Sequence, residues 1–167
     1  MIRVIGIDPG LRNTGWAVIE VHKFTKEVKF IDCGVIKTTT TLSLAERLHQ
    51  LHLGIDEKIK MFAIQAAAIE ETFVNMNYAS SLKLAQARAA AMLSLSIAGL
   101  IPSEYSPTTV KKTIVGTGRA EKEQVMKMLR LLIKGLNDIK SRDASDALAI
   151  ALCHAHHGLN NLHNYSA

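Results

Sequence analysis

Four acidic residues at three places in the sequence have the types and positions of a divalent-metal site. Asp8 and Glu70 each follow directly after a run of mostly apolar residues, and Asp143 and Asp146 open an apolar segment near the C-terminus. Two aspartates three residues apart lie on one face of a helix, so both can point into a single site. Carboxylate oxygens suit Mg²⁺ or Mn²⁺, and neither Cys nor His is spaced for zinc here.

The segments that precede Asp8 and Glu70 are typical of buried β-strands. They are residues 2–7 (IRVIGI) and residues 63–69 (AIQAAAI). Open α/β sheets bind ligands at the ends of their strands, so an acid at this position reaches both solvent and a ligand. Glu71 would point to the opposite side of a continuing strand, which favours Glu70 as the site residue.

The pattern of the remaining residues predicts an α/β fold. Short turns separate the first three predicted strands, which indicates an antiparallel meander. Helices and two further strands then alternate, so we expect a mixed five-stranded sheet flanked by helices, an order that resembles the ribonuclease H-like fold. The expected strands are 2–8, 15–21, 27–37, one ending at Glu70, and 101–105; the expected helices are 44–59, 77–98 (largely buried), 107–115, 120–134 and 142–158.

Length and composition favour one domain. The chain has 167 residues, of which 48% are hydrophobic, and this is enough for one hydrophobic core. We expect a single ribonuclease H-like domain over residues 1–158 and a flexible, Asn-rich tail over 159–167. No apolar run reaches the roughly 18 residues of a membrane helix, and the N-terminus lacks a signal-peptide pattern, which predicts a cytoplasmic protein without membrane contact.

Positive charge is concentrated in one part of the chain. The formal net charge is +5, and residues 111–142 contain nine Lys or Arg against three acids. A basic surface beside a cluster of carboxylates is the pattern of an enzyme that holds a polyanion while metal ions cut it. A solvated helix face is the alternative, so the charge indicates nucleic acid only in combination with the metal site.

Several motifs together resemble those of one enzyme family. They occur in the family's order and spacing over nearly the whole chain except the tail, and the family is the RuvC family of bacterial Holliday junction resolvases. The matching segments are 6–10 (GIDPG), 14–15 (TG), 68–70 (AIE), 82–88 (LKLAQAR), 107–111 (PTTVK), 115–118 (VGTG), 120–122 (AEK) and 143–149 (DASDALA).

The resemblance implies a homodimeric, Mg²⁺-dependent endodeoxyribonuclease that acts in homologous recombination and DNA repair. Such an enzyme nicks opposed strands of a four-way DNA junction symmetrically and leaves 5′-phosphate ends, and a two-fold dimer presents two equivalent sites to the junction. The resemblance also implies that RuvA and RuvB, which form a branch-migration complex, are partners. It assigns Asp8, Glu70, Asp143 and Asp146 to two Mg²⁺ ions, for which Mn²⁺ could substitute.

The resemblance also indicates residues that contact DNA. Lys111 and Lys122 match lysines that contact DNA phosphate near the active site, with an ordinary surface lysine as the alternative. Phe73 matches an aromatic residue that stacks on bases at the junction centre, and core packing is its alternative. Further expected backbone contacts are Arg12, Lys112 and Arg119.

Other functions stay open on the sequence. Another ribonuclease H-like nuclease, acting on RNA:DNA hybrids, would use the same four acids, and a junction-binding module would need a missing metal ligand, which is not observed. The turn at residues 8–10 also occurs in ATP-binding proteins of the actin type, but their two-domain architecture needs a much longer chain. The Ala-rich helix 77–98 could be core or a dimer surface.

Overall fold

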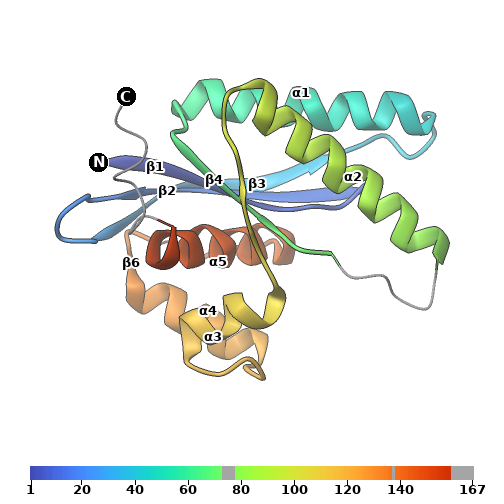
Figure 1. Cartoon of the computed structure of the whole chain (residues 1–167). Helices are drawn as coiled ribbons and strands as arrows, with labels where there is room; N and C mark the ends of the chain where they lie inside the picture. Colours follow the sequence, from blue (N-terminus) through green and yellow to red (C-terminus); the bar gives the residue numbers. More distant parts are fainter. Residues whose placement is uncertain (73–77, 137, 159–167) are drawn as a thin grey trace.

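A six-stranded sheet separates two groups of helices (Figure 1). The computed structural model describes residues 1–72, 78–136 and 138–158. Helices α1 and α2 cover one face of the sheet, and α5 covers the other, with α3 and α4 beyond it. The elements are β1 (Ile2–Asp8), β2 (Asn13–Val21), β3 (Val28–Lys37), α1 (Leu44–Phe62), β4 (Ala66–Glu70), α2 (Tyr78–Ile97), β5 (Ser103–Tyr105), α3 (Pro107–Val115), α4 (Lys122–Leu132), β6 (Ile133–Lys134) and α5 (Arg142–His157).

The sheet has the strand order β5-β4-β1-β2-β3-β6. The first three strands form the predicted antiparallel meander, while β4 runs parallel to β1 and β5 runs parallel to β4. The prediction of five strands was wrong by one, because Ile133–Lys134 pairs in parallel with Val28–Lys29 as a sixth strand. A two-residue strand is too short to show an alternating pattern, and residues 133–134 continued the helical pattern of the segment before them.

Side chains of β1 alternate between two hydrophobic cores. Ile5 and Ile7 pack among residues of α1 and α2. Val4 belongs to the second core, which is formed largely by α5. Both cores use the central strands, so the sheet is buried on both faces where the meander meets β4.

Two glycines let α5 lie very close to the sheet. A Cβ at Gly6 would be 2.2 Å from the carbonyl oxygen of Ala147, and one at Gly15 would be 2.0 Å from the carbonyl oxygen of Asp143. Both contacts are to backbone atoms, which cannot rotate away. These glycines therefore fix the position of the first turns of α5 against β1 and β2.

The helix-start signals of the sequence are confirmed at α3. Ser106 caps this helix by accepting a hydrogen bond from the Thr109 amide at 3.1 Å, and Pro107 occupies the first turn. Gly116 ends the helix in the left-handed conformation, with φ of 83°.

Helix α2 differs from its prediction as a largely buried helix. Its buried residues are Ala87, Ala91, Ser94 and Leu95. Leu82, Leu93 and Ile97 are exposed, because the helix contacts the sheet and α1 along one face only. None of the helices in the described ranges is long and apolar enough to span a membrane.

Candidate active site

Strand alternation places Asp8 and Glu70 on the same face of the sheet. Strands β1 and β4 are parallel neighbours in which Ile7 pairs with Ile69, so the two acids occupy the next position of each strand. Their side chains lie on the face opposite to Ile7 and Ile69, which pack against α1 and α2. Both acids therefore face α5.

The N-terminal turns of α5 bring the other two acids to the same place. Ser141 caps this helix through a hydrogen bond from the Ala144 amide at 3.4 Å. The backbone of Asp143 contacts Gly15, which pairs in register with Asp8 on the neighbouring strand. Asp146 lies one turn further along the same helix. Residues from three distant parts of the sequence thus meet at one end of β1.

The electrostatics of Asp8 reflect this convergence. Burial, and then the negative charges of Glu70, Asp146 and Asp143, raise the pKa of Asp8 to about 8. Burial and the charge of Asp146 also raise the pKa of Glu70. Carboxylates whose charges raise one another's pKa are characteristic of functional sites. Such a group needs a neutralising cation or proton.

Two lysines stand beside the carboxylates. The ammonium nitrogen of Lys122 forms an ion pair with Asp146 Oδ2 at 2.6 Å. The charges of Lys122 and Lys111 both act on Glu70 to lower its pKa, against the stronger effect of burial. The structure therefore brings together the four acids and two of the six predicted DNA-contacting residues.

The donor set of this site fits a hard divalent cation. All four acids supply carboxylate oxygens, the ligands that Mg²⁺ and Mn²⁺ prefer. Within the described part of the chain, no three Asp, Glu, His or Cys side chains already surround one point as metal ligands. Lys122 is paired with Asp146, and the carboxylates repel one another, so a bound cation would supply the charge that favours their convergence.

Sequence reasoning missed the residues that brace this site. Arg88 of α2 donates from Nε to the backbone carbonyl of Glu70 at 3.1 Å, and its guanidinium also pairs with Glu104 of the next strand. It fixes the end of β4 from the far face of the sheet. Arg88 belongs to the segment 82–88 that was singled out, but only the folded chain shows that it reaches Glu70.

The turn after Asp8 is braced in a similar way. The buried hydroxyl of Thr14 donates to the carbonyl of Gly10 at 2.6 Å and accepts from the Gly10 amide at 3.2 Å. Arg47 of α1 donates to the carbonyl of Leu11 at 3.2 Å and to the Thr38 hydroxyl at 3.0 Å. These bonds connect the Asp8 turn to α1, a contact without any local sequence signal.

Comparison with known proteins places this arrangement in a family. Residues 4–154 match the family model of the crossover junction endodeoxyribonuclease RuvC. The chain belongs to the RuvC family. The matched range includes all four acids and all six predicted DNA-contacting residues.

RuvC proteins from several bacteria are similar to this chain over most of their length. The crossover junction endodeoxyribonuclease RuvC of Rhodospirillum rubrum is 52% identical over 156 residues, which are 93% of this chain and 90% of that protein. The protein of the same name from Azorhizobium caulinodans is 50% identical over 157 residues, covering 94% of this chain and 91% of its own.

Solved structures agree with this assignment. The structure of T. thermophilus RuvC in complex with Holliday junction substrate superposes with a TM-score of 0.87 at 30% sequence identity, covering 96% of each chain. The yeast mitochondrial Holliday junction resolvase Ydc2 shares the fold at 14% identity, with a TM-score of 0.67. The ribonuclease H-like fold expected from the sequence is thereby confirmed.

The described part of the chain shows no contact between the four carboxylates and the other predicted DNA-contacting residues. Phe73 lies outside the described residues. Arg12, in the turn after β1, and Lys112 and Arg119, on and after α3, are exposed. None of these three forms an ion pair with a described residue. Their side chains are accessible to a polyanion.

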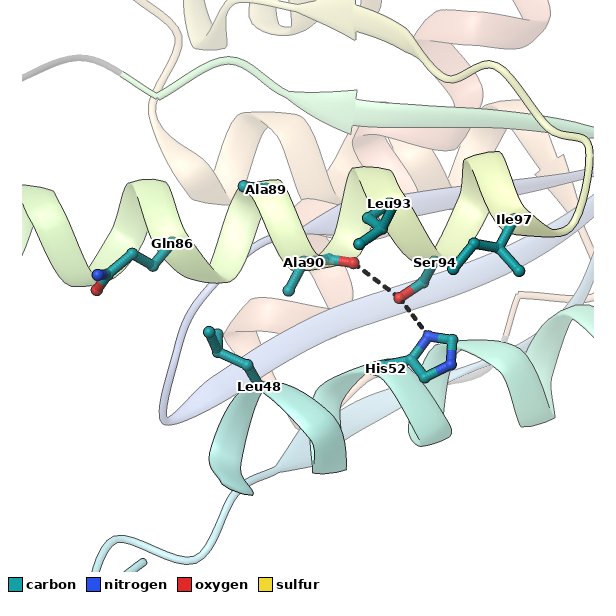
Figure 2. A pocket seen from close by; sticks show the side chains of 8 residues that line it. All are labelled: Leu48, His52, Gln86, Ala89, Ala90, Leu93, Ser94 and Ile97. Carbon is teal, nitrogen blue, oxygen red and sulfur yellow. Dashed lines mark hydrogen bonds between the residues drawn. The ribbon is translucent and has the colours of Figure 1, made fainter. Parts of the chain in front are cut away.

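A separate hollow lies between α1 and α2, on the other side of the sheet (Figure 2). Its volume is about 440 Å³, and Leu48, Leu93 and Ile97 contribute apolar surface. The Ser94 hydroxyl lies 2.9 Å from His52 Nδ1 and donates to the Ala90 carbonyl at 2.7 Å, as the dashed lines in Figure 2 show. These bonds satisfy the Ser94 hydroxyl and one ring nitrogen of His52 within the hollow. The apolar side chains that line it remain at its surface.

Proposed function

We propose that this protein is a Holliday junction resolvase, an endonuclease that nicks opposed strands of a four-way DNA junction symmetrically and leaves 5′-phosphate ends. The observation that carries the proposal is the meeting of four carboxylates at the end of β1 in a chain of the RuvC family. We propose a single nuclease domain over residues 1–158. Homologous recombination and DNA repair are the processes that require this activity.

Asp8, Glu70, Asp143 and Asp146 are the residues that would hold Mg²⁺, with two ions per site and Mn²⁺ as a substitute. The ions supply charge that activates water and stabilises the leaving 3′ oxygen during phosphodiester hydrolysis. The protein contributes the placement of the four ligands. Burial and mutual repulsion make this placement unfavourable for the carboxylates alone, which favours cation binding.

Lys111 and Lys122 position the DNA beside the carboxylates. Each carries a charge that already acts on Glu70, so a phosphate bound between them would lie within reach of the site. Lys122 would exchange its ion pair with Asp146 for a DNA phosphate. Phe73, three residues after Glu70, is proposed to stack on bases at the junction centre, and Arg12, Lys112 and Arg119 to contact the backbone.

We propose that the protein acts as a homodimer and that α2 supplies the contact. Two active sites related by a two-fold axis match the two equivalent cleavage points of a junction. Leu82, Leu93 and Ile97 of α2 are each more than 60% exposed and flank or line the hollow between α1 and α2. Apolar surface of this kind favours association. By family, RuvA and RuvB are proposed partners in junction processing.

Cleavage of synthetic DNA tests this function. A mobile four-way junction is compared with duplex, nicked duplex and RNA:DNA hybrid, each with Mg²⁺ and with EDTA, and the products are offered to a ligase. Paired, ligatable nicks confined to the junction and dependent on Mg²⁺ are expected. Cutting of the hybrid would assign the chain to another nuclease activity, and junction binding without nicks in any metal would reduce it to a binding module.

A further inference from the structure

A second hollow on the molecule lies directly beside the candidate active site. It is a cleft of about 630 Å³ between α4 and the segment that leads into α5. Five basic side chains line it against a single acid, Glu123; they are Lys122, Lys127, Arg130, Lys140 and Arg142. A site for an apolar ligand or for a metal ion does not require such an excess of positive charge. The cleft therefore fits a polyanion.

Most of this charge is available to a ligand. Lys127, Lys140 and Arg142 form no ion pair or side-chain hydrogen bond with any residue that the structure describes. Arg130 pairs with Asp138 at 2.8 Å, but both side chains are more than half exposed. Exposed pairs of this kind are weak, because water and salt screen them, so Arg130 can exchange partners at small cost.

The cleft adjoins the carboxylates through Lys122. Lys122 lines it and also forms the 2.6 Å ion pair with Asp146. Ser145, the residue before Asp146, lines it as well. From Lys122 to Arg130, α4 advances by about 12 Å at its usual rise per residue. Three to four nucleotides of a DNA strand advance by roughly the same distance.

We propose that this cleft binds the phosphate backbone of the cleaved strand over about three nucleotides on one side of the nick. Lys127, Lys140 and Arg142 are its phosphate-binding residues, in addition to those expected from the sequence. The inference rests on the proposed function, since it is the position next to a site that cuts a phosphodiester, with Lys122 shared between the two, that favours DNA over an acidic protein segment. These contacts hold the strand in register with the carboxylates and read no bases.

The salt dependence of binding measures these contacts. Junction binding is followed in EDTA over a range of salt for the wild type, for Lys127→Gln/Lys140→Gln/Arg142→Gln, and for a control with Lys23→Gln/Lys26→Gln/Lys29→Gln. The control lysines are exposed and lie around the β2–β3 turn, at the opposite end of the sheet from Asp8. Both triple variants lose the same charge, so a difference between them reflects location.

We expect the slope of log affinity against log salt to fall by about two to three in the cleft variant, close to 0.9 for each lost phosphate contact. Affinity near physiological salt should fall about 10-fold or more, with little change in the control. Phosphate-ethylation interference should mark about three phosphates on one side of the nick in the wild type, and the cleft variant should lose that pattern.

An unchanged slope in the cleft variant, or an equal loss in the control, would overturn the proposal. So would interference that is confined to the nicked phosphate or is retained by the cleft variant. These readouts are independent of catalysis. A wild-type protein that binds the junction but never nicks it would contradict the proposed function, while the slope comparison would still decide what the cleft binds.

Discussion

The two faces of the sheet differ in chemistry although they share the same strands. On the α5 face, half-buried carboxylates meet at the end of β1, and two glycines allow the helix backbone to lie directly against the strands. On the other face, α1 and α2 leave an open, mostly apolar hollow between them. One strand serves both, because alternate residues of β1 face opposite ways. The proposed metal site and the proposed dimer contact therefore lie on opposite faces of one sheet.

Removing a carboxylate should have the largest effect and should be confined to the α5 face. Asp8→Asn keeps the size of the side chain but removes a ligand charge, so we expect nicking to fall by more than about 100-fold, since even groups supporting a metal ligand cost 10- to 100-fold. Junction binding should remain within a few-fold of wild type. Nicking assays with band-shift titration check this, and normal nicking would refute the role of Asp8.

Close packing of α5 is tested with Gly15→Ala. The new Cβ would meet the Asp143 carbonyl, so α5 must move, which should lower the free energy of unfolding by about 1–3 kcal/mol and displace a proposed metal ligand. Gly116→Ala is the control, because its Cβ meets nothing within 4 Å and only its φ of 83° is unfavourable, at about 1 kcal/mol. Urea unfolding and nicking are measured together. Equal nicking in both variants would show that the contact does not position Asp143.

The apolar face is tested with Leu93→Asp. A charge at this exposed leucine should prevent dimerisation and convert paired nicks into slower, single-strand nicks, while the metal site stays intact. The control is Leu53→Asp, at an exposed position of α1 that does not line the hollow, and this variant should remain a dimer. Sedimentation velocity distinguishes the two. A dimeric Leu93 variant would remove α2 from the proposed interface.

The pH dependence of stability should be a smaller effect, to which Asp8 contributes strongly. Its pKa rises from 3.8 to about 8 on folding, so between these values the folded state holds the proton that the unfolded state has lost. The free energy of unfolding should therefore decrease as pH rises from about 4 to about 8 and level off above. Asp8→Asn should reduce this decrease, and saturating Mg²⁺ should offset it. Urea unfolding at several pH values measures both, and a parallel pH profile in the variant would contradict the assignment.

Local patterns predicted most of the fold. The apolar run before Asp8, the Ser106-Pro107 helix start and the three-residue spacing of Asp143 and Asp146 are short-range signals, and each of these elements formed where it was expected. Features that depend on distant partners were missed. The two-residue strand β6 exists only because β3 pairs with it. The exposure of α2 depends on how far α1 and the sheet extend beneath it.

The same division applies to the site. The four acids could be selected from the sequence because a strand end or a helix start exposes a polar group, and their convergence follows from parallel pairing of β1 with β4. Arg88 could not be selected, since its bond to the Glu70 carbonyl joins a helix to a strand across the sheet. The cleft along α4 also needed the fold, because its basic residues come from two separate segments.

Anomalous diffraction from crystals soaked in Mn²⁺ tests the central claim most directly. The account predicts anomalous peaks among the carboxylates of Asp8, Glu70, Asp143 and Asp146, with Lys122 released from Asp146, and no such peaks in Asp8→Asn. Peaks only elsewhere on the molecule, or none between these four side chains at saturating Mn²⁺, would contradict it.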